Sequence, residues 1–249
     1  MRLCGSVAPK EWQWAERCGT DRLQLKATTL PAELLRVNAQ TPDPDALRYA
    51  AHLLARGCVI GIPTDTFYGL AADPFNLAAV DEIYRVKGRP DTRALPILVN
   101  SLDQAMVLMR ERVFEGTSPY PTKKFMLLAE AFWPGGLTLV MDASNRVPLK
   151  VTANTGKVAL RWPKSPVVDG LIDEFGGPVT GTSANISGFP ASSNTEQLMK
   201  QLGSRIPLIL DAGETGAGLP STIVGLQDEK WEILREGAIP VAEIEQVLS

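Results

Sequence analysis

The 249-residue chain is poor in histidine and cysteine and lacks the common phosphate-binding loops. His52 is the only histidine and lies within the first expected long helix, where a structural role is favoured, so a Ser-His-Asp triad, a Cys-His pair and a histidine-rich zinc site are all disfavoured. Cys4, Cys18 and Cys58 form an odd set without a CxxC pair, so we expect three reduced thiols rather than a disulfide framework or a zinc ribbon. Neither GxxxxGK[ST] nor GxGxxG occurs. The missing residues therefore disfavour histidine, zinc and P-loop chemistry.

A basic excess and long apolar runs are also missing. The chain carries 25 Lys and Arg against 28 Asp and Glu, whereas nucleic-acid binders are usually strongly basic. No apolar run approaches the ~20 residues that span a bilayer. Residues 1–30 lack the apolar core of a signal peptide, and their acidic residues disfavour a transit peptide. We therefore expect a cytoplasmic protein without membrane association, with residues 1–30 as an N-terminal extension of unknown order.

Segments of strand length alternate with segments of helix length along residues 31–249. Strands are expected at 33–37, 58–62, 95–99, 137–141, 158–161, 178–181, 208–210, 222–224 and about 231–234. Helices are expected behind the caps Asp45, Asn76 and Asn194, after Ser101, up to Phe132, at 167–175, and from about 241. This alternation predicts one α/β domain with a twisted, largely central sheet covered by helices.

A polar loop follows the second expected strand. Thr64, Asp65 and Thr66 stand between this buried strand and an aromatic pair, so the loop offers hydroxyl and amide donors to a small polar ligand. In open α/β sheets, ligands bind beyond strand ends. The alternative is a capped turn with Tyr68 packed beneath it.

Fixed cations follow the helix capped by Asn76. Lys87 and Arg89, with Arg93 four residues further, suit a phosphate chain, because arginine offers a planar fork and lysine a point charge. The alternative is favourable pairing of these cations with the dipole of the helix C-terminus.

Two further segments carry groups that suit an anion. Ser183 and Asn185 follow a buried strand and could hold phosphate oxygens or an adenine edge, although both residue types also favour turns. The glycine-rich stretch 213–220 leads into Ser221, and its backbone N–H groups could approach an anion. Arg235 is a late cation whose alternative is a plain surface arginine. Together with the lack of an activated nucleophile, these groups favour catalysis by positioning and charge neutralisation, as in phosphoryl or adenylyl transfer.

Seven segments in a fixed order resemble the threonylcarbamoyl-AMP synthase (YrdC-like) family. They read PTDTFYGLAADPFN, IYRVKGRP, FWPGGLTLV, VALRWP, GTSANISG, PSTIV and ILREGAI. The resemblance covers about residues 32–249 and is to the short, single-domain members. It implies a twisted, open, mixed sheet with covering helices and a concave, positively lined groove, so that residues 31–249 would form one catalytic domain.

The resemblance also implies a reaction and its partners. Members of the family join L-threonine, bicarbonate and ATP into threonylcarbamoyl-AMP and pyrophosphate, with Mg²⁺ accompanying the nucleotide. The product feeds the threonylcarbamoyladenosine modification of tRNA, which downstream threonylcarbamoyl-transferase proteins complete. A weak contact with tRNA is a further expectation.

Site residues follow from the same resemblance. The catalytic set would be Lys87, Arg89, Ser183 and Asn185. ATP would be bound by Lys87, Arg89, Arg93, Lys157, Ser183, Asn185 and Arg235. Threonine would be bound by Thr64, Thr66, Arg161, Gly181 and Ser221, with Arg161 on its carboxylate. No protein side chain is assigned to a metal.

One residue departs from the family pattern, and two other functions compete. Leu98 stands where many relatives carry a histidine, so any role of that histidine is absent here. The first alternative is an RNA-binding module on the same fold without adenylation activity. The second is a carbamoyl-transferring domain of hydrogenase maturation, which the lack of zinc-ligand spacing disfavours.

Overall fold

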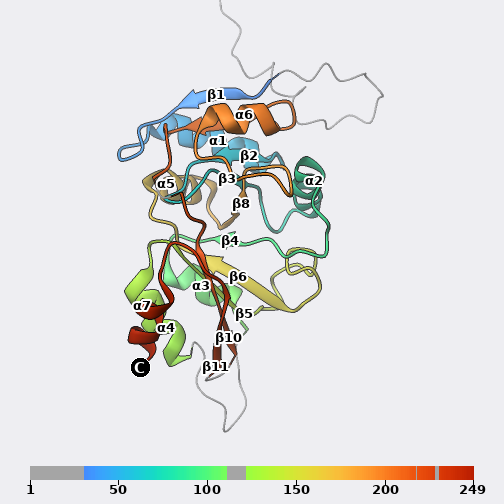
Figure 1. Ribbon diagram of the computed structural model, residues 1–249. Helices are drawn as coiled ribbons and strands as arrows, with labels where there is room; N and C mark the ends of the chain where they lie inside the picture. The colour runs from blue at the N-terminus through green and yellow to red at the C-terminus, as the bar shows by residue number, and fades with distance from the viewer. Residues whose placement is uncertain (1–30, 111–121, 217, 228–229) are drawn as a thin grey trace, which may run out of the picture.

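Two mixed β-sheets, stacked one above the other with helices around them, make up the fold (Figure 1). The computed structural model describes residues 31–110, 122–216, 218–227 and 230–249. The predicted mixed α/β class is confirmed, with the strands shared between two sheets rather than one central sheet. Residues 1–30 lie outside the described residues, so the predicted N-terminal extension and domain boundary stay predictions.

The upper sheet in Figure 1 has five strands in the order β1-β9-β2-β3-β8. The pairs β1–β9 and β9–β2 are parallel, and β2–β3 and β3–β8 are antiparallel. The strands are β1 (Glu33–Arg36), β2 (Ile60–Ile62), β3 (Gly69–Ala71), β8 (Thr182–Ser183) and β9 (Leu208–Asp211).

The lower sheet has six strands in the order β11-β10-β5-β6-β4-β7. The pairs β10–β5 and β4–β6 are parallel, while the other neighbours are antiparallel. The strands are β4 (Ile97–Leu98), β5 (Leu137–Asp142), β6 (Lys157–Arg161), β7 (Val179–Thr180), β10 (Thr222–Gln227) and β11 (Lys230–Arg235).

Gly181 alone separates the two sheets where the chain passes from β7 to β8. A second link joins the sheets at this point: the Ala72 N–H donates to Thr180 Oγ1 at 2.9 Å, and the Thr180 N–H donates to the Ala72 carbonyl at 2.9 Å. The polar residues that follow β7 are therefore held between the sheets.

Short polar side chains start most of the helices. Asn76 Oδ1 accepts from the N–H groups of Ala78 and Ala79, and Asn194 Oδ1 accepts from that of Gln197, so both predicted caps are confirmed. The predicted cap at Asp45 is wrong. Asp43 caps that helix and accepts from the Asp45 N–H, because Pro44 takes the first helical position. The helices are α1 (Pro44–Ala55), α2 (Leu77–Lys87), α3 (Leu102–Leu108), α4 (Lys123–Phe132), α5 (Pro166–Phe175), α6 (Thr195–Leu202) and α7 (Val241–Leu248).

Two hydrophobic clusters bury the faces of these elements. The smaller one packs α1 against α5 and includes Leu53, Leu54 and Ile172, which are fully buried. The larger one includes residues of α2, α3, α4, α6 and α7 and of strands from both sheets. Within the described part of the chain, the structure contains no helix long and apolar enough to cross a membrane. Cys58 is disulfide-bonded, so the expectation of three reduced thiols is wrong for this residue.

Candidate active site

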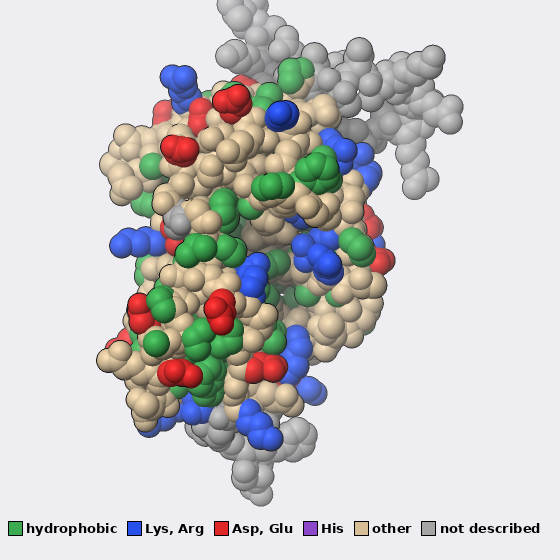
Figure 2. Space-filling view, viewed as in Figure 1, with side chains coloured by type: hydrophobic (Ala, Val, Ile, Leu, Met, Phe, Trp, Pro, Cys, Tyr) green, Lys and Arg blue, Asp and Glu red, His purple; other side chains and the backbone are tan. Residues whose placement is uncertain are grey.

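Most of the predicted site residues meet in a cavity of about 660 Å³. The molecular surface is hollowed between the upper and lower halves of the molecule, with Lys and Arg side chains at the margins of the hollow (Figure 2). The upper sheet contributes the loop before β3 and strand β8, and the lower sheet contributes β4, β5, β6, β10 and β11. The predicted residues that line the cavity are Thr64, Thr66, Arg89, Arg161, Gly181, Ser183, Asn185, Ser221 and Arg235.

The pleat of the lower sheet directs one face of β5 and one face of β6 into the cavity. On β6, Ala159 and Arg161 line the cavity, while the alternating residues Val158 and Leu160 are buried in the larger hydrophobic cluster. Side chains alternate between the two faces of a strand, so residues at every second position of β6 face the cavity. The apolar residues of the same strand hold the sheet against its helices, which fixes the direction of Arg161.

The loop of residues 63–68 presents hydroxyl groups beside β6. Thr64 Oγ1 donates to the Phe67 carbonyl at 2.6 Å and lies 3.1 Å from Thr66 Oγ1. Tyr68 is fully buried beneath the loop, and its hydroxyl donates to the Gly213 carbonyl at 2.7 Å. Burial raises the pKa of Tyr68 to about 12, so the phenol stays protonated. The loop is therefore both a packed turn and a polar wall of the cavity.

Arg161 donates a hydrogen bond from each of its three guanidinium nitrogens. Its Nε donates to the Gly135 carbonyl at 3.0 Å, Nη1 to Thr66 Oγ1 at 3.0 Å, and Nη2 to the Asp65 carboxylate at 2.6 Å. Burial lowers the pKa of Arg161, and the Asp65 carboxylate opposes that effect. Arginine has five N–H donors. One donor on each terminal nitrogen therefore remains for a ligand, which is the fork that a carboxylate requires.

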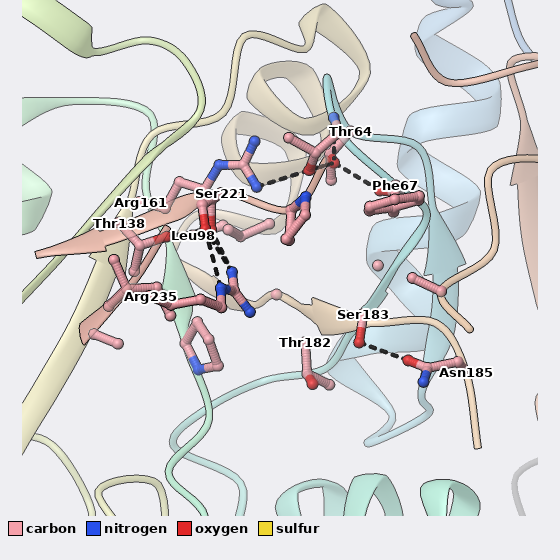
Figure 3. Close-up of a pocket in the computed structure, with 18 of the residues that line it drawn as sticks. Thr64, Phe67, Leu98, Thr138, Arg161, Thr182, Ser183, Asn185, Ser221 and Arg235 are labelled. Carbon is pink, nitrogen blue, oxygen red and sulfur yellow. Dashed lines mark hydrogen bonds between the residues drawn. The ribbon is translucent and has the colours of Figure 1, made fainter. Parts of the chain in front are cut away.

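Ser221 lies between Arg161 and Arg235 (Figure 3). Arg235 Nη2 donates to the Ser221 carbonyl at 2.7 Å and lies 3.1 Å from Ser221 Oγ. Thr138 Oγ1 lies 2.8 Å from the same Ser221 hydroxyl. Burial lowers the pKa of Arg235, and its charge contributes to the lowered pKa of Arg161. Two cations thus share one end of the cavity with a network of hydroxyl groups.

Arg89 brings a third cation from the end of α2. The helix ends at Gly88, which adopts the left-handed conformation at φ 56° and turns the chain toward the cavity. Arg89 Nη2 donates to the Ala94 carbonyl at 2.9 Å, while its buried Nε has no hydrogen-bond partner. Burial, and to a lesser extent the charge of Arg93, lowers the pKa of Arg89. An unpaired buried donor costs about 1–3 kcal/mol, which suits a residue that awaits a ligand.

The turn after β8 presents Ser183 and Asn185. Ser183 Oγ donates to Asn185 Oδ1 at 2.6 Å, as Figure 3 shows. Asn185 Nδ2 donates to the carbonyls of Ile186 at 3.0 Å and Phe189 at 2.6 Å. Both side chains are therefore fixed within the turn and do not swing freely into the cavity.

Three of the predicted ATP-binding cations do not line the cavity. Lys87 is buried behind the turn that carries Ser183 and is 1% exposed. Lys157 forms an ion pair with Asp142 at 2.6 Å, and Arg93 is exposed near Arg89. The nucleotide-binding roles of these three residues remain predictions. Of the described residues in the stretch 213–220, Pro220 alone lines the cavity.

Sequence reasoning assigned no role to two residues that support the site. Asp65 is inside the recognised loop, yet nothing in the sequence shows that it pairs with Arg161. Thr138 is inside FWPGGLTLV, where a polar residue between the apolar Leu137 and Leu139 of a strand was the available signal. Leu98 also lines the cavity, and a Cβ on Gly181 would lie 2.3 Å from the Leu98 side chain. Leucine therefore fills the space above Gly181.

The charged lining of the cavity is purely cationic in the described part of the chain. Arg89, Arg161 and Arg235 line it, whereas no Asp, Glu or His does, and His52 is exposed on α1. The described residues contain no group of three His, Cys, Asp or Glu that could hold a metal ion. The side chains thus fit a ligand with several negative charges and do not fit a resident Mg²⁺.

Comparison with known proteins assigns the chain to a family. Residues 52–237 match the model of the Sua5/YciO/YrdC family, which carries the description "Telomere recombination". The chain belongs to this family. The resemblance predicted from the seven segments is therefore confirmed at the family level.

Curated relatives within the family share about a third of their residues with this chain. A Pyrococcus abyssi protein named threonylcarbamoyl-AMP synthase is 36% identical over 202 residues, which cover 81% of this chain and 57% of the relative. A Bacillus subtilis protein of the same name is 37% identical, with 84% of this chain and 58% of the relative covered. This chain thus spans less than three-fifths of these two relatives. A Vibrio parahaemolyticus protein of that name, 32% identical, is covered over 100% of its length.

Solved structures of family members share the fold. P. abyssi Sua5 complexed with L-threonine superposes with a TM-score of 0.80 at 33% identity and covers 87% of this chain and 61% of its own. Escherichia coli YciO superposes with a TM-score of 0.73 at 22% identity, which supports the fold alone.

Proposed function

We propose that this protein makes threonylcarbamoyl-AMP and pyrophosphate from L-threonine, bicarbonate and ATP. The observation that carries the proposal is the cavity in which Arg89, Arg161 and Arg235 meet Ser183 and Asn185 without an acidic side chain among the described lining residues. The relatives named threonylcarbamoyl-AMP synthase and the threonine-bound P. abyssi structure support it. ATP and bicarbonate are anions, threonine carries a carboxylate, and the expected carbamate is an anion, so the three arginines would neutralise negative charge throughout the reaction.

The amino acid would bind at the Arg161 end of the cavity. The two free N–H donors of Arg161 suit its α-carboxylate, and the hydroxyl groups of Thr66 and Ser221 suit its polar atoms. Nearby cations disfavour a protonated amine and favour a carbamate anion. The cavity would thus favour transfer of one ammonium proton from threonine to bicarbonate, which breaks down to CO₂ and water. The amine nitrogen would then form a bond to the carbon of CO₂ and release a second proton to solvent as the carbamate anion forms.

The nucleotide would bind between Arg89 and the turn of Ser183. A carbamate oxygen would then attack the α-phosphorus, and the bond from that phosphorus to the β-phosphate oxygen would break to release pyrophosphate. Arg89 has a buried, unpartnered Nε and further free donors, so it is suited to stabilise charge on the phosphoryl oxygens. Burial would also shield the labile carbamate from water.

Mg²⁺ would enter with ATP as its companion, because the described side chains do not offer it a ligand cluster. We infer further that the product is made in the cytoplasm and passed to downstream threonylcarbamoyl-transferase proteins that modify tRNA. A weak contact of this chain with tRNA remains a prediction.

The test is pyrophosphate release that requires both threonine and bicarbonate. Arg89→Ala and Ser183→Ala should each abolish it while circular dichroism shows a folded protein. Arg85→Ala is the matched control, because Arg85 is an exposed residue of α2 that pairs with Glu82. Full activity in both cavity variants would contradict the site. RNA binding without any pyrophosphate release in the unmodified protein would instead favour the RNA-binding alternative.

A further inference from the structure

Lys87 has no donor left for a ligand. Its ammonium group donates to the carbonyl of Ser183, to the carbonyl of Asn185 at 2.9 Å and to Asn185 Oδ1 at 3.2 Å. A lysine ammonium has three N–H donors. The three bonds therefore use the whole donor capacity of the side chain.

All of these acceptors belong to the turn that presents Ser183 and Asn185 to the cavity. Asn185 Oδ1, which Lys87 contacts, also accepts from Ser183 Oγ at 2.6 Å. The backbone adds a further tie, because the Ser187 N–H donates to the Lys87 carbonyl at 2.9 Å. Both the side chain and the main chain of Lys87 thus form hydrogen bonds with the turn, on the side away from the cavity.

Burial of the Lys87 ammonium group costs desolvation free energy, which a residue that only filled space would not need to incur. Its side chain is 1% exposed, and among the described residues no carboxylate lies within ion-pair distance of it. Burial, with the charge of Arg89, lowers the pKa of Lys87 to about 7. An apolar side chain would avoid the desolvation penalty but would leave the carbonyls of the turn unsatisfied. The hydrogen bonds that Lys87 donates to the turn therefore explain why a charged side chain is buried at this position.

Two residues of the same segment thus have different positions. Arg89 lines the cavity, whereas Lys87 stands one layer behind it. We propose that Lys87 is a positioning residue that holds the Ser183–Asn185 turn in its working shape and makes no contact with the nucleotide. This inference rests on the proposed function, because the shape of the turn matters for activity only if Ser183 and Asn185 bind the nucleotide. The hydrogen bonding of the turn itself can be tested without substrate.

The first experiment measures deuterium exchange in the ligand-free protein. Lys87→Met should raise the exchange rate of peptides that span residues 183–189 by about tenfold or more, because each lost charged hydrogen bond loosens the turn. Helix α1, which lies away from the turn, is the internal reference and should be unchanged. Lys87→Gln retains two N–H donors without the charge, so it should restore part of the protection. If the Met variant does not fold, the Gln variant carries the test by its smaller increase over the unmodified protein.

The second experiment measures pyrophosphate release in a double-mutant cycle. Ser183→Ala should reduce kcat/KM strongly in the unmodified protein and much less in the Lys87→Met background, because the turn is already displaced there. The Gln variant should be more active than the Met variant. Multiplicative losses with unchanged exchange at 183–189 would show that Lys87 acts on the ligand directly, and would overturn the proposal. Absence of threonine-dependent turnover in the unmodified protein would refute the proposed function, while the exchange experiment would still decide the role of Lys87.

Discussion

Replacement of Arg161 with lysine tests the amino-acid end of the cavity, because the structure shows every bond that would be lost. Arg161 donates to the Gly135 carbonyl, to Thr66 Oγ1 and to Asp65. A lysine ammonium is a point charge on a flexible stem and cannot reproduce the planar fork. We expect Lys to keep the ion pair with Asp65 and to lose the two bonds to neutral acceptors.

The magnitude follows from these losses. Two neutral hydrogen bonds at about 0.5–1.5 kcal/mol each predict a fall of about 1–3 kcal/mol in the free energy of unfolding. Loss of one charge-assisted bond to the substrate carboxylate costs a further ~1.5–3 kcal/mol in binding. With about 1.4 kcal/mol for each factor of ten, kcat/KM for threonine should fall by about 10- to 150-fold.

The assay is pyrophosphate release across a threonine series at saturating ATP and bicarbonate, combined with urea unfolding. Arg85→Lys, on the exposed face of α2, is the matched control and should stay within about twofold of the unmodified protein, since exposed ion pairs contribute little. If Arg161→Lys lowers stability but leaves kcat/KM for threonine within about twofold, Arg161 is only a structural link and the reasoning fails.

Two further predictions concern packing and pH. Gly181→Ala would place a Cβ 2.3 Å from Leu98, so unfolding by urea should show a loss of about 1–3 kcal/mol. Because Leu98→Ala removes the clash but also empties a buried position, the double variant should lose less than the sum of the two single losses, and additive losses or an unchanged midpoint for Gly181→Ala would contradict the packing. Because burial lowers the pKa of Lys87 to about 7, the unfolded chain binds more protons than the folded one between about pH 7 and pH 10. The free energy of unfolding should therefore rise with pH in this range relative to that of Lys87→Met, by at most about 1.4 kcal/mol per pH unit, and a constant difference between the two proteins would refute the shifted pKa.

Local features of the fold were predictable because they depend on residues close in sequence. Asn76 and Asn194 cap helices through N–H groups two or three residues away, and sequence spacing reveals such bonds. The error at Asp45 arose between two aspartates that flank Pro44, where the proline decides in favour of Asp43. The division into two sheets was not predictable, because strand pairing depends on long-range contacts and β7 meets β8 across a single residue.

The site was predictable as a set of residues but not as a geometry. The motif that contains Lys87 and Arg89 predicts two phosphate-binding cations. Only the folded chain shows that the end of α2 points Arg89 at the cavity and buries Lys87 behind it. Similarly, Lys157 alternates with the residues of β6 as a cavity residue would, but Asp142 on the neighbouring strand takes its charge. Partners that are far apart in sequence decide which cations remain available.

The most direct measurement is detection of the product from carbon-13-labelled bicarbonate. The protein is incubated with L-threonine, ATP, Mg²⁺ and the label, and the nucleotides are separated and analysed by mass spectrometry. We expect a threonylcarbamoyl-AMP species that carries one labelled carbon, in equal amount to the pyrophosphate released, and that is missing with Arg89→Ala. Release of pyrophosphate without label in any AMP adduct, or no release at all from the unmodified protein, would contradict it.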